Sequence, residues 1–195
     1  MYVDARGVRT YYEELGAGEP VLLLHGGGVT ADSWLAQAPA LAERYRVLIP
    51  ERRGHGRSPD VDGPVTMEIF AADTVAFVEA LELGPVHLIG WSDGGKVGMS
   101  LALSRPELVG KLVLIGTELK ALPVPVLLMQ GDDDCVRIEH TAEVARAIPD
   151  AQVAVVPGTS HGLPLEKPGL VNSLLLDFLA DPQPPKFMPL GDLNP

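Results

Sequence analysis

Residues 86–95 decide the fold, and they read Val86-His87-Leu88-Ile89-Gly90-Trp91-Ser92-Asp93-Gly94-Gly95. An apolar strand is followed at once by Gly-x-Ser-x-Gly and then by a run of small residues that predicts a helix over 93–104. The backbone of a serine in such a sharp strand-to-helix turn is strained, and glycine on either side relieves the crowding. This context predicts a nucleophile elbow at Ser92. The alternative interpretation is an ordinary helix N-cap.

Short apolar runs alternate with longer amphipathic stretches on both sides of the elbow. This alternation is typical of an α/β fold in which helices pack on a mostly parallel sheet. We expect Val8–Glu14 to be an edge strand. The other strands are interpreted as buried on both faces, namely Val21–Leu24, Arg46–Ile49, Val86–Ile89, Lys111–Ile115, Val126–Met129 and Gln152–Val156. Further helices are expected over about 66–83, where Gly84-Pro85 follows, and near 32–44, 137–147 and 167–180.

Length and composition predict one domain. A chain of 195 residues with 46% apolar side chains can bury one sizeable core. We expect a catalytic domain over 1–180 and an irregular tail over 181–195, because five prolines fall in the tail.

Charge and cysteine usage exclude several classes of partner. The net charge of -11 disfavours binding to nucleic acid or to an anionic membrane. No apolar run approaches the roughly 20 residues of a transmembrane helix. Cys135 is the only cysteine, and the first residues lack the apolar run of a signal peptide, so we expect a cytoplasmic protein without an internal disulfide.

A glycine-rich loop, His25-Gly26-Gly27-Gly28, follows the strand Val21–Leu24. Such a loop can direct backbone N–H groups at a developing oxyanion, and we expect Gly27 and Asp93 to supply the two donors. A flexible connection or a phosphate-binding loop is the alternative. The loop lacks the spacing of dinucleotide sites and the Gly-Lys-Ser/Thr ending of a P-loop.

Two further polar clusters follow strand ends. Gly131-Asp132-Asp133-Asp134 follows the strand that ends near Met129, and Ser160-His161-Gly162 follows the strand that ends at Val156. In open α/β sheets, sites form outside the carboxyl ends of strands. The chain order Ser, Asp, His is that of α/β-hydrolase triads. Three adjacent acids also fit a hard-cation site, but further oxygen ligands at spaced positions are missing, so we expect no metal.

The motifs together resemble the α/β-hydrolase superfamily over nearly the whole chain except the tail. They are His25–Gly28, Arg53–Ser58, Gly90–Gly95, Gly131–Asp134 and Gly158–His161. The resemblance implies Ser92 as nucleophile, His161 as general base and then acid, and Asp134 as the carboxylate that orients the imidazole. It places the acid three residues after the glycine, which selects Asp134. A serine at the elbow resembles the esterase, lactonase, thioesterase and cofactor-free perhydrolase branches.

The chain departs from the family between its sixth and seventh family strands. Only Thr117–Pro123 lies where members often insert a helical cap, and the crossover helix is missing too. Such a link reaches at most about 23 to 25 Å. It predicts either a direct crossing that exposes an apolar sheet face or exchange of Val126–Met129 and all that follows with a second copy. Both routes predict a homodimer, strand-swapped in the second.

Other polar and reactive residues are interpreted as structural. His55 lies in the family turn Arg53–Ser58, Cys135 is expected to be a small packing residue, and Trp91 a core residue at the pocket edge. The expected function is hydrolysis of a small carboxylic ester, lactone or thioester without a cofactor. The alternatives are a hydrolase-like ligand-binding or interaction protein and a weakly active hydrolase without a cap that assembles as a dimer.

Overall fold

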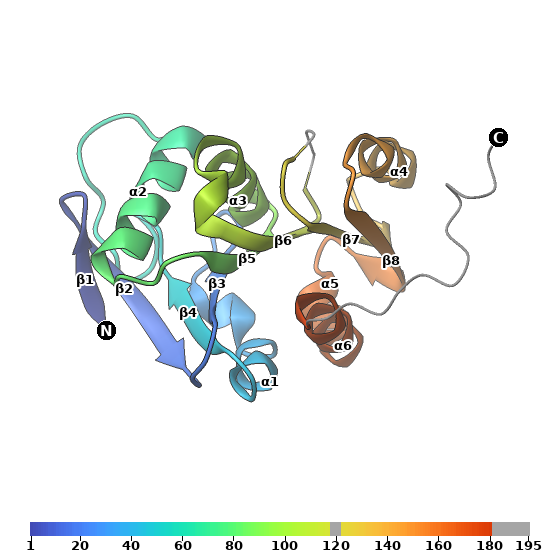
Figure 1. Cartoon of the computed structure of the whole chain (residues 1–195), viewed down its shortest axis with the longest axis horizontal. Helices are drawn as coiled ribbons and strands as arrows, with labels where there is room; N and C mark the ends of the chain where they lie inside the picture. The colour runs from blue at the N-terminus through green and yellow to red at the C-terminus, as the bar shows by residue number, and fades with distance from the viewer. Residues whose placement is uncertain (118–121, 181–195) are drawn as a thin grey trace.

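A computed structural model of the chain describes residues 1–117 and 122–180, which form one eight-stranded sheet (Figure 1). The strand order is β1-β2-β4-β3-β5-β6-β7-β8. β1 and β2 pair antiparallel, as do β2 and β4, and all later pairs are parallel. The strands are β1 (Tyr2–Ala5), β2 (Val8–Leu15), β3 (Pro20–Leu24), β4 (Arg46–Pro50), β5 (Val86–Trp91), β6 (Val109–Ile115), β7 (Val126–Asp133) and β8 (Ala151–Ser160).

Helices cover both faces of the sheet, which gives the layered α/β architecture predicted from the sequence (Figure 1). One face carries α2 (Met67–Ala80), α3 (Asp93–Ser104) and α4 (Ile138–Ala147), and a short η2 (Pro106–Leu108) follows α3. The other face carries η1 (Ala31–Trp34), α1 (Ala38–Ala42), α5 (Leu163–Glu166) and α6 (Pro168–Leu179). In the described part of the chain, no helix has the length and apolar character needed to cross a membrane.

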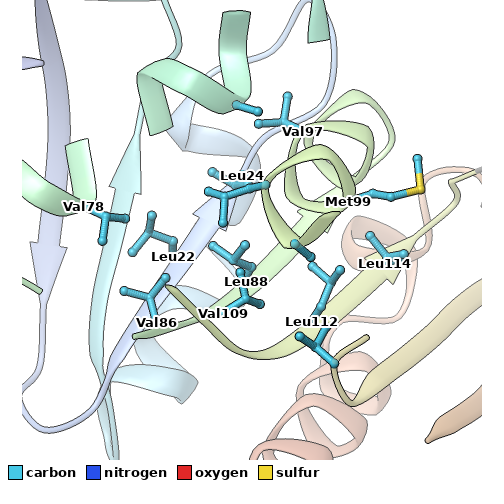
Figure 2. Packing of buried hydrophobic residues seen from close by; sticks show 14 of the residues in the cluster. Leu22, Leu24, Val78, Val86, Leu88, Val97, Met99, Val109, Leu112 and Leu114 are labelled. Atoms are coloured by element: carbon cyan, nitrogen blue, oxygen red, sulfur yellow. The ribbon is translucent and has the colours of Figure 1, made fainter. Parts of the chain in front are cut away.

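The two-residue period of the central strands builds a core on each face. Leu22 and Leu24 of β3 join the cluster beneath α2 and α3, as Figure 2 shows, whereas Val21 and Leu23 join the cluster beneath α1 and α6. Strands buried on both faces must be apolar throughout, and β3 is. The alternation of side chains along β3 therefore determines which layer of helices each residue packs against.

Three predictions about elements are wrong. β2 is not an edge strand, because β1 pairs with its outer side. β8 is not buried on both faces, because it ends the sheet, and Val153 is 47% exposed and Val155 37%. The helix expected over 32–44 is divided into η1 and α1, with Pro39 in the first turn of α1.

The connection from β6 to β7 is short, as the sequence predicts. β6 and β7 pair in parallel register within one chain, with Leu112 opposite Val126 and Ile115 opposite Met129. The described parts of this connection, 116–117 and 122–125, contain no helix.

The apolar sheet face that the first of the two predicted routes, a direct crossing, would expose is buried. Leu114 of β6 and Leu128 of β7 belong to the same buried cluster as Leu122 and Val124 of the connection. The predicted tail, 181–195, lies outside the described residues.

Candidate active site

Ser92 stands in a strained turn between β5 and α3. Its φ of 54° and ψ of -117° lie where residues other than glycine are rare. A Cβ on Gly90 would lie 2.5 Å from the Gly94 carbonyl oxygen, and one on Gly94 would overlap the Leu24 carbonyl. The Ser92 N–H donates to the Ile115 carbonyl at 2.8 Å. The two glycines therefore allow the turn, and β6 holds it.

The N-cap interpretation of Ser92 does not hold. Ser92 occupies the position before α3, but its side chain makes no capping hydrogen bond. Its Oγ lies instead 3.0 Å from His161 Nε2.

His161 lies between Ser92 and Asp134. Its Nδ1 is 2.9 Å from Asp134 Oδ1, which also accepts from the Val136 N–H at 3.1 Å. A carboxylate only accepts, so Nδ1 carries the proton and Nε2 is free to accept from the Ser92 hydroxyl. Burial acts to raise the pKa of Asp134, but the hydrogen bonds from His161, Val136 and Cys135 outweigh it and hold the pKa below its usual range.

The neighbouring aspartates do not reach the histidine. Asp132 Oδ1 accepts from the Thr159 N–H at 3.1 Å and so holds the loop before His161. Asp133 is exposed. Of the three, Asp134 alone lies within hydrogen-bonding distance of His161 among the described contacts.

Arg52, at the end of β4, holds the glycine-rich loop. Its guanidinium donates to the His25 carbonyl at 2.7 Å and to the Gly26 carbonyl at 2.8 Å. The Arg52 N–H donates to His25 Nε2, so His25 Nδ1 carries the ring proton and donates to Gly26 O at 2.8 Å. Burial, aided by the Arg52 charge, lowers the pKa of His25 to about 3. Burial lowers the pKa of Arg52 to about 10.

This network sets the direction of the Gly27 N–H. Gly26 C=O and Gly27 N–H belong to one planar trans peptide, so they point in opposite directions. Because Arg52 and His25 fix the carbonyl, the N–H is fixed as well. A Cβ on Gly26 would lie 3.6 Å from Ser92 Cβ, so the loop lies against the elbow.

Three residues near the site, Thr117, Arg52 and Cys135, were missed or misread from sequence, whereas Trp91 is a buried core residue as predicted. Trp91 Nε1 donates to the His161 carbonyl at 2.9 Å, and Thr117 Oγ1 donates to the Ser92 carbonyl at 3.1 Å. Arg52 has no motif of its own. Cys135 is not a packing residue, because it is exposed and its Sγ lies 3.6 Å from His161 Nδ1. No local pattern identifies these roles, since each depends on a contact between distant segments.

The site is open to solvent. The His161 side chain is 36% exposed. A hollow of about 290 Å³ lies beside it, lined by Cys135, Val136, Arg137 and His140. A second hollow, of about 460 Å³, is lined by Asp132, Asp133, Gly158, Thr159, Ser160 and Glu166.

Fold and site define an α/β protein that carries a strained serine, hydrogen-bonded to a histidine, between a strand and a helix. The chain belongs to the alpha/beta hydrolase fold family, which matches residues 19–124.

Two relatives illustrate the extent of the similarity. The chain is 38% identical over 120 residues to a 2-hydroxy-6-oxo-6-(2'-aminophenyl)hexa-2,4-dienoic acid hydrolase of Metapseudomonas resinovorans, covering 60% of the chain and 41% of the relative. It is 27% identical over 264 aligned residues to a non-heme haloperoxidase of Rhodococcus erythropolis, covering 89% of the chain and 96% of the relative. That alignment is longer than the 195-residue chain, so part of the relative has no counterpart in this chain.

Solved structures share the fold. An esterase from Thermogutta terrifontis superimposes with a TM-score of 0.86 at 22% identity, covering 92% of this chain and 97% of that one. The enol-lactonase from Burkholderia xenovorans LB400 gives 0.86 at 19% identity, with 92% and 99% covered.

Proposed function

We propose that this chain is a serine hydrolase that cleaves small carboxylic esters, lactones or thioesters through an acyl-enzyme on Ser92. The observation that carries the proposal is the hydrogen-bonded series from Ser92 Oγ to His161 Nε2 and from His161 Nδ1 to buried Asp134. A serine is a weak nucleophile until an adjacent base takes its proton, and His161 is that base. Asp134 keeps the proton on Nδ1 and stabilises the imidazolium.

Acylation begins when Ser92 Oγ attacks the carbonyl carbon and its proton passes to His161 Nε2. The Gly27 and Asp93 N–H groups stabilise the negative oxygen of the tetrahedral intermediate. The intermediate collapses, the bond to the leaving oxygen or sulfur breaks, and His161 protonates the leaving group. Ser92 then carries the acyl group as an ester.

Deacylation repeats these steps with water. His161 Nε2 takes a proton from the attacking water, a second tetrahedral intermediate forms, and its collapse breaks the ester to Ser92. His161 returns the proton to Ser92 Oγ, and the carboxylic acid leaves. These steps need no cofactor. The names of the fold neighbours, an esterase and an enol-lactonase, are consistent with acyl transfer from oxygen.

Perhydrolysis is a second candidate for the same site. The haloperoxidase of R. erythropolis, which the chain matches over 96% of that protein's length, favours it. Hydrogen peroxide would replace water in deacylation, so the acyl-enzyme would release a peroxyacid. Hydrolysis and perhydrolysis of one ester can be compared by measuring acid and peroxyacid from the same acyl-enzyme.

The decisive experiment measures turnover of p-nitrophenyl acetate by the wild type and by Ser92→Ala and His161→Ala. Both variants should lose activity by about 10⁴ to 10⁶ in kcat, because these residues act as a unit. Circular dichroism should show an unchanged fold. A fluorophosphonate should label Ser92.

Three results would count against the proposal. Retained turnover in either variant would exclude this mechanism, and labelling of another serine would move the nucleophile. A folded wild type without turnover would favour a ligand-binding or interaction protein.

A further inference from the structure

Asp134, Cys135 and His161 form a cluster that the proposed mechanism uses only in part. Each offers one atom that can bind a metal, and the three atoms lie within 4.8 Å of one another. Cys135 Sγ lies 3.6 Å from His161 Nδ1, and Asp134 Oδ1 lies 2.9 Å from the same nitrogen. Neither attack nor proton transfer requires the thiol, which interacts with the Asp134 carboxylate by a hydrogen bond as well as lying against the ring.

The distance from Cys135 Sγ to His161 Nδ1 matches the ligand spacing of a tetrahedral zinc ion. With Zn–S of about 2.3 Å and Zn–N of about 2.0 to 2.1 Å, a tetrahedral angle separates sulfur and nitrogen by about 3.6 Å. The same geometry separates nitrogen and carboxylate oxygen by about 3.4 Å. The sulfur already has the required spacing, whereas the separation between nitrogen and carboxylate oxygen has to grow by about half an ångström as the carboxylate turns aside for the ion.

A second observation concerns Asp134. Its side chain is fully buried, and its Oδ2 has no hydrogen-bond partner among the described residues. A buried carboxylate oxygen without a partner is unfavourable, and a cation bound by Oδ2 after rotation of the carboxylate would satisfy it. The exposed thiol and the partly exposed imidazole let an ion approach from solvent.

We propose that Asp134, Cys135 and His161 bind a soft divalent cation such as Zn²⁺, with water as the fourth ligand, and that this cation inhibits the enzyme. Thiolate and imidazole favour zinc over magnesium or calcium. The inference concerns regulation of the same site and so rests on the proposed function.

Inhibition follows from the tautomer of His161. A neutral imidazole that binds a cation through Nδ1 carries its proton on Nε2. The thiol loses its proton to solvent, so one cation enters and one proton leaves. Nε2 then has no lone pair to accept the Ser92 proton, and the general base is lost.

The test compares the wild type with Cys135→Ala and Cys135→Ser. In buffer with a chelator, all three should hydrolyse p-nitrophenyl acetate at similar rates, because the thiol takes no part in the reaction. Micromolar free zinc should inhibit the wild type, and chelator should reverse it. The variants should need at least about tenfold more zinc, since one ligand is lost. Magnesium should have no effect on any of them.

Binding is measured separately from activity. Ser92→Ala protein is titrated with cadmium, and the ultraviolet charge-transfer band of a cadmium–thiolate bond should saturate at one ion per chain. Equal zinc inhibition of the wild type and both Cys135 variants, or no cadmium–thiolate band, would overturn the inference. Failure of the proposed function would appear differently, as no turnover in chelated buffer, and the cadmium titration would still decide whether the site binds metal.

Discussion

Among single residues, Asp134 is the clearest case in which one of several equivalent side chains is selected by its position. Asp132 and Asp133 precede it directly, yet Asp134 is the one whose carboxylate accepts from His161. Asp134→Asn should lower kcat by about 10⁴, because the amide favours the wrong imidazole tautomer. Asp133→Asn should remain within about twofold, and Asp132→Asn should lose less than Asp134→Asn. A large loss of kcat in Asp133→Asn would show that the orienting acid is Asp133 and not Asp134.

Gly116 tests how closely the His161–Asp134 pair must be held. A Cβ at this position would lie 2.8 Å from His161 Nδ1 and 3.1 Å from Asp134 Oδ2. Gly116→Ala should displace the pair and lower kcat by about 10², since small misplacements of reacting groups are costly.

Gly84 provides the matched control for Gly116. The φ of Gly116 is 56° and that of Gly84 is 68°, and a Cβ on Gly84 meets nothing within 4 Å. Both alanine variants should lose about 1 to 2 kcal/mol of stability in thermal unfolding. Only Gly116→Ala should lose turnover, and equal turnover in both would show that contact with the pair is unimportant.

The role of such a residue can be predicted from sequence only when it depends on neighbours along the chain. Ser92 with its glycines is a contiguous pattern, so the strained elbow could be predicted. Arg52 and Cys135 act on segments more than twenty residues away, and no spacing rule connects them to the site. The choice of Asp134 among three acids needed the family resemblance, which the contact with His161 agrees with.

At the scale of elements, the loop after β3 is held by the end of β4. Arg52 donates to two carbonyls of that loop and so orients the Gly27 N–H. Arg52→Gln should lower kcat by up to about 10², the effect of losing one oxyanion donor, with a smaller change in KM. Arg52→Lys keeps the charge but not the two-carbonyl geometry, so it should recover only part of kcat.

Arg53 is the control for Arg52. Its guanidinium pairs with Asp73 rather than with the loop. Arg53→Gln should reduce stability and leave kcat nearly unchanged. An equal loss of kcat in both variants would indicate a general packing effect instead of control of the oxyanion donor.

Buried elements could be predicted from sequence better than peripheral ones. β3, β5 and β6 are mainly apolar and largely buried, so their sequences predict central strands. β1 is only four residues long, with two of them exposed, so it is too short to carry a pattern. β8 has an apolar sequence typical of a central strand, but its place at the end of the sheet comes from topology and exposes Val153 and Val155.

For the whole molecule, the buried His25 predicts how stability depends on pH. Its pKa is about 3 in the folded protein and about 6.5 when unfolded, so the unfolded chain binds the extra proton between these values. The free energy of unfolding should therefore fall as pH decreases below about 6.5, by up to about 1.4 kcal/mol per pH unit from this group. Midpoints of urea unfolding, determined between about pH 7 and about pH 5, measure this change in the free energy of unfolding.

A pair of variants isolates the contribution of His25. His25→Gln removes the titrating ring and should flatten the acid dependence over this range, whatever its effect on stability at neutral pH. His140→Gln, at a half-buried histidine that lines the hollow with Cys135, should keep the wild-type slope. An unchanged slope in His25→Gln would assign the acid sensitivity to other groups.

The last prediction is that the chain self-associates as a homodimer. The face left by the short β6–β7 connection is filled by Leu122 and Val124, so it does not supply the surface. The edge strand β8 supplies the surface for self-association, because it ends the strand order and exposes Val153 and Val155. An exposed sheet edge of this kind pairs readily with another copy. Sedimentation at micromolar concentration should show a dimer, and Val155→Lys should shift it toward monomer.

A swapped dimer would place Ser92 of one copy beside His161 of the other, so Ser92→Ala and His161→Ala chains refolded together would regain activity. An unswapped dimer would not regain it, and a wild-type monomer would contradict both forms.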